Sequence, residues 1–327
     1  MNNFKNKKVL FIGPIFFNYH EVIIEKLIQQ KNEVTFIPEE ENSKFEWVIL
    51  KISPVLLKHY LNNLIQRKIS KLESNFNVIF LIRGAWIEPR ILENLKTQNP
   101  QAKFIMYQWD STISNSNFLK ISDFFDKIFS FDPSDCAKFH NFIYLPLFFS
   151  NNNFYDLLPT INEKYDLLFV GKWYTDRIEI LEKIKTENNR LKIKILILIS
   201  PLRYFIEKIL LRNISFLQRK EFVFKQISYN DFLSLILSSN AVIDIEHPLQ
   251  TGLTIRTFEV LSMGKKLITT NQFIKKEPFY DNQIIAVIDR QNPKIADDFL
   301  KKRNEKFLDF ADYSIDSWLN KIFGTDL

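Results

Sequence analysis

Apolar residues along the chain form short strand-like runs that alternate with segments of helical periodicity. In the first half the runs lie at 9–13, 33–37, 77–84, 103–110, 127–132 and 142–149, and helical patterns occupy 19–30, 54–73, 88–97 and 133–139. The runs are nearly continuous and rich in β-branched and aromatic residues, which is typical of parallel strands buried on both faces. The pattern predicts an α/β domain over residues 1–150.

The alternation restarts after the polar segment 150–165, which contains a proline and is expected to be the interdomain linker. Strands are predicted at 165–171, 192–200, 221–228, 241–246, 266–271 and 284–289, and helices at 176–187, 202–212, 229–238 and 254–263. We expect a second domain over 165–305, helical structure from about residue 294, and a C-terminal helical segment, 306–327, that packs back on the first domain. Two such units predict two facing Rossmann-like domains with a cleft between them.

Composition narrows the class of protein further. A chain of 327 residues with 46% hydrophobic residues can bury two cores. The single cysteine, Cys136, excludes a disulfide framework and favours a cytoplasmic protein, and no signal peptide or membrane-spanning run is expected. The four histidines are scattered, so we expect neither a metal site nor a cofactor. The net charge of +6 favours an anionic ligand or surface.

Glycine is rare, and its positions are informative. The chain has 6 glycines, where average usage gives roughly twenty. Five of them end an apolar strand or border a helix: Gly13, Gly84, Gly171, Gly252 and Gly264. Such positions favour close approach of the backbone to a ligand, or a positive φ.

The segment 241–271 has the pattern of a phosphate-binding unit. An apolar strand runs into a polar turn and a short helix, whose first N–H groups and positive dipole end favour an anion. The candidate donor-binding residues here are Glu246, Gln250, Thr251, Gly252, Leu253, Thr254 and Arg256. Each has an alternative: the turn is only a tight polar loop, Thr254 and Thr257 are helix caps, and Arg256 covers the sheet edge.

Glu259 lies on a largely apolar face of the same helix, one turn from Ile255 and from Met263. A carboxylate buried without a partner costs several kcal/mol, so a partner is expected. Two ribose hydroxyls are one candidate partner, and a neighbouring lysine or arginine is the other.

The segment 169–177 repeats the same order of elements. A strand ends at Gly171, Lys172 and Arg177 follow, and Asp176 begins a helix. Two cations beside a glycine turn suit a diphosphate, because charge-assisted hydrogen bonds to phosphate are strong. A solvated basic loop is the alternative.

The first domain offers polar residues at the carboxyl ends of its strands. On the acceptor side these are Gly13, Asn18, Tyr19, Arg83 and Trp109, and the candidate catalytic residues are Asp110 and His20. A carboxylate or an imidazole at such a position suits general acid–base work or the orientation of an acceptor. For Asp110, a helix cap or a turn is the alternative.

Three segments resemble bacterial glycosyltransferases of the GT-B fold that act in lipopolysaccharide and capsular polysaccharide biosynthesis. They are YDLLFVGKWYTDR, IEHPLQTGLTIRTFEVLSMGKKLITTN and FADYSIDSWLNKIF. The resemblance implies that Glu259 is the second Glu of an E-x7-E motif and binds the nucleotide ribose, while Thr251 stands where the first Glu would be. In this family an Arg and a Lys five residues apart hold the diphosphate. Lys172 and Arg177 have this spacing with the two residue types in the reverse order, and the resemblance implies the same role for them.

This resemblance implies a metal-independent glycosyltransferase. Its donor would be a nucleotide-sugar and its acceptor a saccharide or a lipid-linked glycan, with no nucleic acid as partner. A sugar-nucleotide epimerase of the same architecture and a non-catalytic nucleotide- or glycan-binding subunit are the alternatives. The amphipathic segment 201–213, with apolar Leu202 and Phe205 on one face and Arg203 on another, is expected either to lie on the inner face of an anionic membrane or to pack on the sheet.

Overall fold

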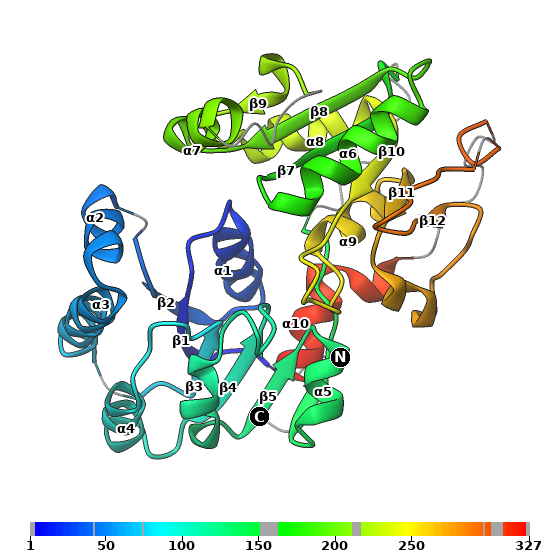
Figure 1. The fold of residues 1–327 in the computed structure, drawn as a ribbon. Coiled ribbons are helices and arrows are strands. Elements are labelled where there is room, and N and C mark those ends of the chain that lie inside the picture. Colours follow the sequence, from blue (N-terminus) through cyan, green and yellow to red (C-terminus); the bar gives the residue numbers. More distant parts are fainter. Residues whose placement is uncertain are drawn as a thin grey trace. The chain divides into compact units, whose positions relative to one another are not determined.

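The computed structural model describes residues 4–41, 43–73, 75–150, 163–210, 217–296, 298–301 and 310–324. The chain divides into two compact units. Unit 1 comprises Met1–Ser150, Leu249–Gly252 and Asp312–Leu327, and unit 2 comprises Asn151–Pro248 and Leu253–Ala311. Each unit contains a parallel six-stranded sheet flanked by helices (Figure 1), so the predicted α/β class is confirmed.

The sheet of unit 1 has the strand order β2-β1-β3-β4-β5-β6. Its strands are β1 (Lys8–Gly13), β2 (Glu33–Pro38), β3 (Val78–Ile82), β4 (Lys103–Gln108), β5 (Lys127–Ser130) and β6 (Phe142–Tyr144). Its helices are α1 (Tyr19–Gln29), α2 (Lys44–Ile52), α3 (Pro54–Ile69), α4 (Pro89–Gln98), α5 (Pro133–Lys138) and α10 (Ile315–Phe323). All strand pairs are parallel, as the near-continuous apolar runs predict.

Successive side chains of each strand point to opposite faces of this sheet, and in the central strands both sets are buried. One face packs against α3 and α4, where Leu10 and Leu81 join Ile65 and Leu92 in one apolar cluster. On the other face the Trp318 ring of α10 contacts Phe80 (6.3 Å between ring centroids), Tyr107 (4.7 Å) and Phe148 (4.6 Å). The C-terminal helix therefore belongs to the core of unit 1.

The sheet of unit 2 has the order β12-β11-β10-β7-β8-β9. Its strands are β7 (Tyr165–Lys172), β8 (Ile193–Leu198), β9 (Phe222–Val223), β10 (Ser239–Asp244), β11 (Lys266–Thr269) and β12 (Ile285–Val287). Its helices are α6 (Thr175–Glu187), α7 (Pro201–Phe205), α8 (Tyr229–Leu237) and α9 (Ile255–Ser262). Read from the third strand of the unit to the last, this is the 3-2-1-4-5-6 order of a Rossmann fold.

Several predicted strands are shorter in the structure. The strand expected at 77–84 ends at Ile82, because Arg83 and Gly84 have φ values of 74° and 66° and leave the extended conformation. The runs 103–110 and 142–149 keep strand structure only to Gln108 and Tyr144, and 221–228 only over Phe222–Val223.

The helical predictions also need correction. Helix α2 was not predicted, although Ser43 and Glu46 form a capping box at its start. The expected helix over 202–212 is instead the five-residue α7 followed by a π-helical turn over Ile206–Leu210, and residues 211–212 lie outside the described part. Residues 294–296 and 298–301 are not helical. Among the described helices none is long and apolar enough to cross a membrane.

Candidate functional site

The topological switch point of unit 2 lies between β7 and β10, which are neighbours in the sheet although their connections lead to opposite edges. Ligands of open α/β sheets bind outside the carboxyl ends of the strands at such a point. Here β7 ends at Gly171 and Lys172, and β10 leads into Asp244, Ile245 and Glu246. The predicted donor residues of both segments therefore lie at one edge of one sheet.

Arg177, in the first turn of α6, reaches across this edge. Its Nε donates to the carbonyl of Ile245 (2.7 Å) and its Nη1 to the carbonyl of Lys172 (3.0 Å). Its guanidinium lies 4.7 Å from the Tyr174 ring centroid. No described carboxylate is within ion-pair distance of Arg177 or of the exposed Lys172 side chain. Burial, and then the charge of Arg256, lower the pKa of Arg177 to about 10. The edge therefore holds a largely desolvated cation that has no direct ion pair among the described residues.

Arg256, in the first turn of α9, is the second partly buried guanidinium at this edge. Its Nη1 donates to Asp244 Oδ1 (2.8 Å), while its Nε is buried and has no hydrogen-bond partner among the described residues. Asp244 also accepts the hydroxyl of Thr254 at 2.5 Å. The Thr257 hydroxyl reaches Asp244 as well, at 3.4 Å. Asp244 thus offsets one of two neighbouring positive charges and leaves the other.

Two helices begin at this edge, and in neither does the N-cap side chain accept a hydrogen bond from the first backbone N–H groups. Thr254 is the N-cap of α9, but its side chain bonds to Asp244 and not to the helix backbone. Tyr174, the N-cap of α6, makes no side-chain cap either. Uncapped N–H groups at the positive end of a helix are donors for an anionic group.

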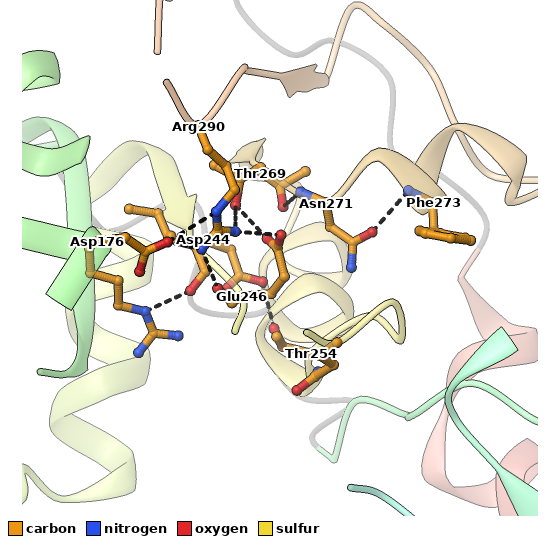
Figure 2. A network of polar contacts seen from close by, with 12 residues as sticks. Asp176, Asp244, Glu246, Thr254, Thr269, Asn271, Phe273 and Arg290 are labelled. Atoms are coloured by element: carbon orange, nitrogen blue, oxygen red, sulfur yellow. Dashed lines mark hydrogen bonds and ion pairs between the residues drawn. The ribbon is translucent and has the colours of Figure 1, made fainter. Parts of the chain in front are cut away.

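Beside the two guanidinium groups lies an ion-pair network centred on Arg290, which the sequence did not predict (Figure 2). Arg290 Nη2 donates to Asp176 Oδ2 (2.5 Å) and Nη1 donates to Glu246 Oε1 (2.6 Å). Glu246 also accepts the hydroxyl of Thr270 at 2.5 Å. Burial raises the pKa of Glu246. The position of Arg290, three residues after the carboxyl end of β12, was the available signal.

Glu259 is fully buried in α9, with 0% exposure. The Tyr229 hydroxyl of α8 donates to its Oε1 at 2.6 Å. Sequence reasoning offered ribose or a basic side chain as the partner, and it did not foresee this tyrosine. The phenol lies 30 residues away in sequence and shares no local motif with the glutamate.

The loop 249–252 belongs to unit 1. The backbone N–H groups of Thr251 and Gly252 donate to Asp132 Oδ2 at 3.0 and 3.1 Å, and the Thr251 hydroxyl bonds to Asp132 Oδ1. A Cβ at Gly252 would meet the Phe131 ring at 2.5 Å, which explains the glycine. The predicted turn donors are therefore engaged by a carboxylate. The Gln250 amide bonds to the Gly252 carbonyl (3.1 Å), and Leu253 is buried.

Unit 1 has its own switch point, between β1 and β3. Positive φ values follow both strands: Arg83, directly after β3, has φ 74°, and Phe17, four residues after the end of β1, has φ 46°. Strain of this kind gathers at ligand sites, where the surroundings hold it in place. Arg83, predicted on the acceptor side, donates to the carboxylates of Glu39 (3.0 Å) and Glu40 (2.7 Å) and is neutralised by them.

The remaining predicted residues of unit 1 occupy different surroundings. Asn18 Oδ1 and His20 Nδ1 are buried without a hydrogen-bond partner among the described residues. The His20 ring stacks on Phe36 (5.2 Å between centroids), and burial lowers the pKa of His20. Tyr19 is buried against Phe148, Trp109 contacts Phe16, and Asp110 is half-buried two residues after β4.

Comparison with known proteins finds similar folds among solved structures. A scan against protein-family models finds no match, and neither does a search of the curated proteins. Among solved structures, the chain is similar to the catalytic domain of starch synthase IV from Arabidopsis thaliana bound to ADP and acarbose, with 7% identity, a TM-score of 0.57 and coverage of 98% of this chain and 96% of that chain.

The chain is also similar in fold to two further solved structures, both of glycosyltransferases. AviGT4, a glycosyltransferase involved in avilamycin A biosynthesis, has 11% identity and a TM-score of 0.56, with 97% of this chain and 93% of that chain covered. A glycosyltransferase from Rickettsia africae has 13% identity and a TM-score of 0.55, with 97% and 96% covered. Likeness at these identities concerns the fold. The chain has the GT-B fold, with two Rossmann-like domains.

Proposed function

We propose that this protein is a glycosyltransferase that moves a sugar from a nucleotide-sugar to a saccharide or lipid-linked acceptor. The observation that carries the proposal is the pair of neighbouring guanidinium groups at the switch point of unit 2. Arg177 has no described ion-pair partner there, and Arg256 keeps a buried Nε without one. A diphosphate supplies the negative charge and the acceptor oxygens that these donors lack.

The same groups suit the chemistry of the leaving group. In glycosyl transfer the acceptor oxygen forms a bond to the anomeric carbon while the bond from that carbon to the diphosphate oxygen breaks. The electron pair of the broken bond stays on the nucleoside diphosphate. Arg177, Arg256, Lys172 and the uncapped N-terminus of α9 stabilise that charge, as preorganised donors do in other enzymes.

The nucleoside part of the donor is assigned to Glu259. In this proposal its buried carboxylate accepts hydrogen bonds from the two ribose hydroxyls, and the hydrogen bond from Tyr229 to Oε1 holds the carboxylate in place. Thr251 and Gly252 are left out of the phosphate site, because their N–H groups bond to Asp132.

The acceptor is assigned to the switch point of unit 1. Arg83 is neutralised there by two carboxylates, so the edge does not favour an anionic acceptor group. The buried Asn18 Oδ1 and His20 Nδ1 offer hydrogen-bonding atoms to neutral hydroxyl groups. If the enzyme inverts, Asp110 takes the proton of the attacking hydroxyl, and if it retains, Asp110 only orients the acceptor.

The biological setting, cell-surface polysaccharide synthesis at the cytoplasmic side of a membrane, rests on the resemblance of the three sequence segments given above. The starch synthase IV neighbour is bound to ADP, which agrees with a nucleoside diphosphate as the leaving group here. Calorimetric titration of the purified chain with nucleoside diphosphates and with the matching nucleosides tests the proposal. We expect the diphosphates to bind much more tightly, and equal affinities would contradict it.

A further inference from the structure

Helix α2 and the start of α3 carry the densest group of exposed apolar side chains among the described residues. Between residues 45 and 56, seven large apolar side chains are exposed: Phe45, Trp47, Val48, Leu50, Ile52, Val55 and Leu56. Ile52 and Val55 are 72% and 76% exposed. Single exposed apolar residues are common on soluble proteins, but a contiguous group marks an interaction surface.

The order of residues in α2 separates an apolar stripe from a basic one. Phe45, Val48 and Ile52 are three and four residues apart and share one side of the helix. Val55 and Leu56, at the start of α3, are exposed as well. Lys44 and Lys51 are seven residues apart, so they lie one above the other beside it. Both lysines are exposed.

The acidic groups near this surface are already engaged. Glu46 is the only carboxylate in the segment 43–60, and it is turned inward, where it accepts the backbone N–H groups of Glu41 and Ser43. The Glu41 carboxylate pairs with Lys68 at 2.7 Å, and Glu40 pairs with Arg83. The charge that this surface presents is therefore positive.

We propose that the surface formed by α2 and the first turn of α3 binds the headgroup region of an anionic phospholipid membrane. An interfacial helix needs an apolar side that enters the acyl boundary and lysines that meet lipid phosphates beside it. Trp47 suits the headgroup level, because its ring is apolar and its N–H is polar, and the Lys51 ammonium lies 5.6 Å from the ring centroid. The proposal does not depend on the proposed glycosyl transfer.

Membrane contact is also predicted for the segment 201–213, but its described residues expose fewer apolar groups than α2 does. The Arg203 guanidinium pairs with Glu207 at 2.6 Å and lies 4.4 Å from the Trp173 ring centroid. Among the described side chains of this segment, 201–208, two large apolar ones are exposed, Leu202 and Phe205. This pair supplies the matched control, because it is exposed, apolar and outside α2.

Vesicle flotation of the full chain tests the proposal. We expect the chain to float with vesicles of equal parts phosphatidylcholine and phosphatidylglycerol at low salt, and to stay behind with phosphatidylcholine alone or at high salt. Phe45→Ser/Ile52→Ser/Val55→Ser should lower partitioning about a hundredfold, at about fivefold for each of these exposed side chains. Lys44→Glu/Lys51→Glu should lower it about tenfold or more.

Circular dichroism shows whether each variant is folded, and nucleoside diphosphate binding reports on unit 2 separately. Leu202→Ser/Phe205→Ser should float like the wild type. Failure of the wild type to float at low salt overturns the proposal, as does flotation that the α2 substitutions leave unchanged. Self-association that these substitutions abolish, without vesicle binding, would assign the surface to a second copy of the chain instead.

Discussion

Replacing Arg177 by glutamine distinguishes the contribution of its charge to ligand binding from the contribution of the side chain to folding stability. The guanidinium holds two backbone carbonyls, of Ile245 and Lys172, and glutamine can replace part of that bonding. Burial lowers the pKa of the Arg177 guanidinium to about 10, which corresponds to about 3 kcal/mol against the charged form. Two charge-assisted hydrogen bonds contribute on the order of 1.5–3 kcal/mol each.

These opposing contributions nearly cancel, so Arg177→Gln should change the free energy of unfolding by only about 1 kcal/mol. The loss on ligand binding has no such compensation. A charge-assisted bond to phosphate contributes on the order of 1.5–3 kcal/mol, and nucleoside diphosphate affinity should therefore fall roughly ten- to a hundredfold. Nucleoside affinity should stay the same, because the nucleoside carries no phosphate.

Calorimetry and denaturant unfolding on the same purified variant measure both quantities. The control is Arg219→Gln, which removes one positive charge from unit 2 at a guanidinium that stacks on Tyr204 and Phe224. Wild-type diphosphate affinity should also decline as the pH rises toward about 10, since the free protein then loses the Arg177 proton. The reasoning is refuted if Arg177→Gln weakens nucleoside and diphosphate binding equally, or if Arg219→Gln has the same effect.

Three further results are expected. Glu259→Gln should abolish the preference for ribose over 2′-deoxyribose nucleotides while Tyr229→Phe mainly lowers the melting temperature; an unchanged preference in calorimetry would remove the ribose assignment. Asp110→Asn should lower kcat about 10²–10⁴-fold with little change in donor affinity. If Asp110→Asn keeps near-normal turnover and His20→Ala loses it, the general-base role belongs to His20 instead. The raised pKa of Glu246 means that the folded state keeps a proton that the unfolded state loses above pH 4.5, so the free energy of unfolding should decline as the pH rises from there. In urea unfolding, Glu246→Gln should not show this decline. A decline that persists in the variant would contradict the reasoning.

The fold followed from features that are local in the sequence. Apolar runs of strand length and helical repeats between them predicted the alternating elements of both sheets, because burial on both faces demands such runs. Where the strand predicted at 77–84 was too long, the cause was backbone conformation. Arg83 takes a positive φ that its residue type does not announce, and the run 77–84 looks continuous in sequence.

The site was less accessible to sequence reasoning, because its contacts join distant positions. The Arg177 and Arg256 pair could be predicted, since each follows a strand and begins a helix. The Tyr229 partner of Glu259 could not, because the two helices meet only in the folded unit. Likewise Asp132 is 119 residues from Thr251, and nothing in the turn sequence shows that its amides are engaged.

The exposed stripe on α2 shows a different limit. Phe45, Val48 and Ile52 have the spacing of a helix that buries an apolar side, and from sequence alone such a stripe is assigned to the core. The structure turns Glu46 inward in their place, because the capping box draws its carboxylate to the backbone. Only the fold distinguishes the two orientations.

Product analysis with a panel of nucleotide-sugars tests the central claim most directly. The purified chain is incubated with each donor and a mixture of saccharide acceptors, and the nucleotides and sugars are identified by mass spectrometry. We expect one donor to release its nucleoside diphosphate, with the sugar transferred or hydrolysed, and Arg177→Gln to suppress this release. An intact nucleotide-sugar with an altered sugar would indicate an epimerase, and tight binding without any product would indicate a binding subunit; either result would contradict glycosyl transfer.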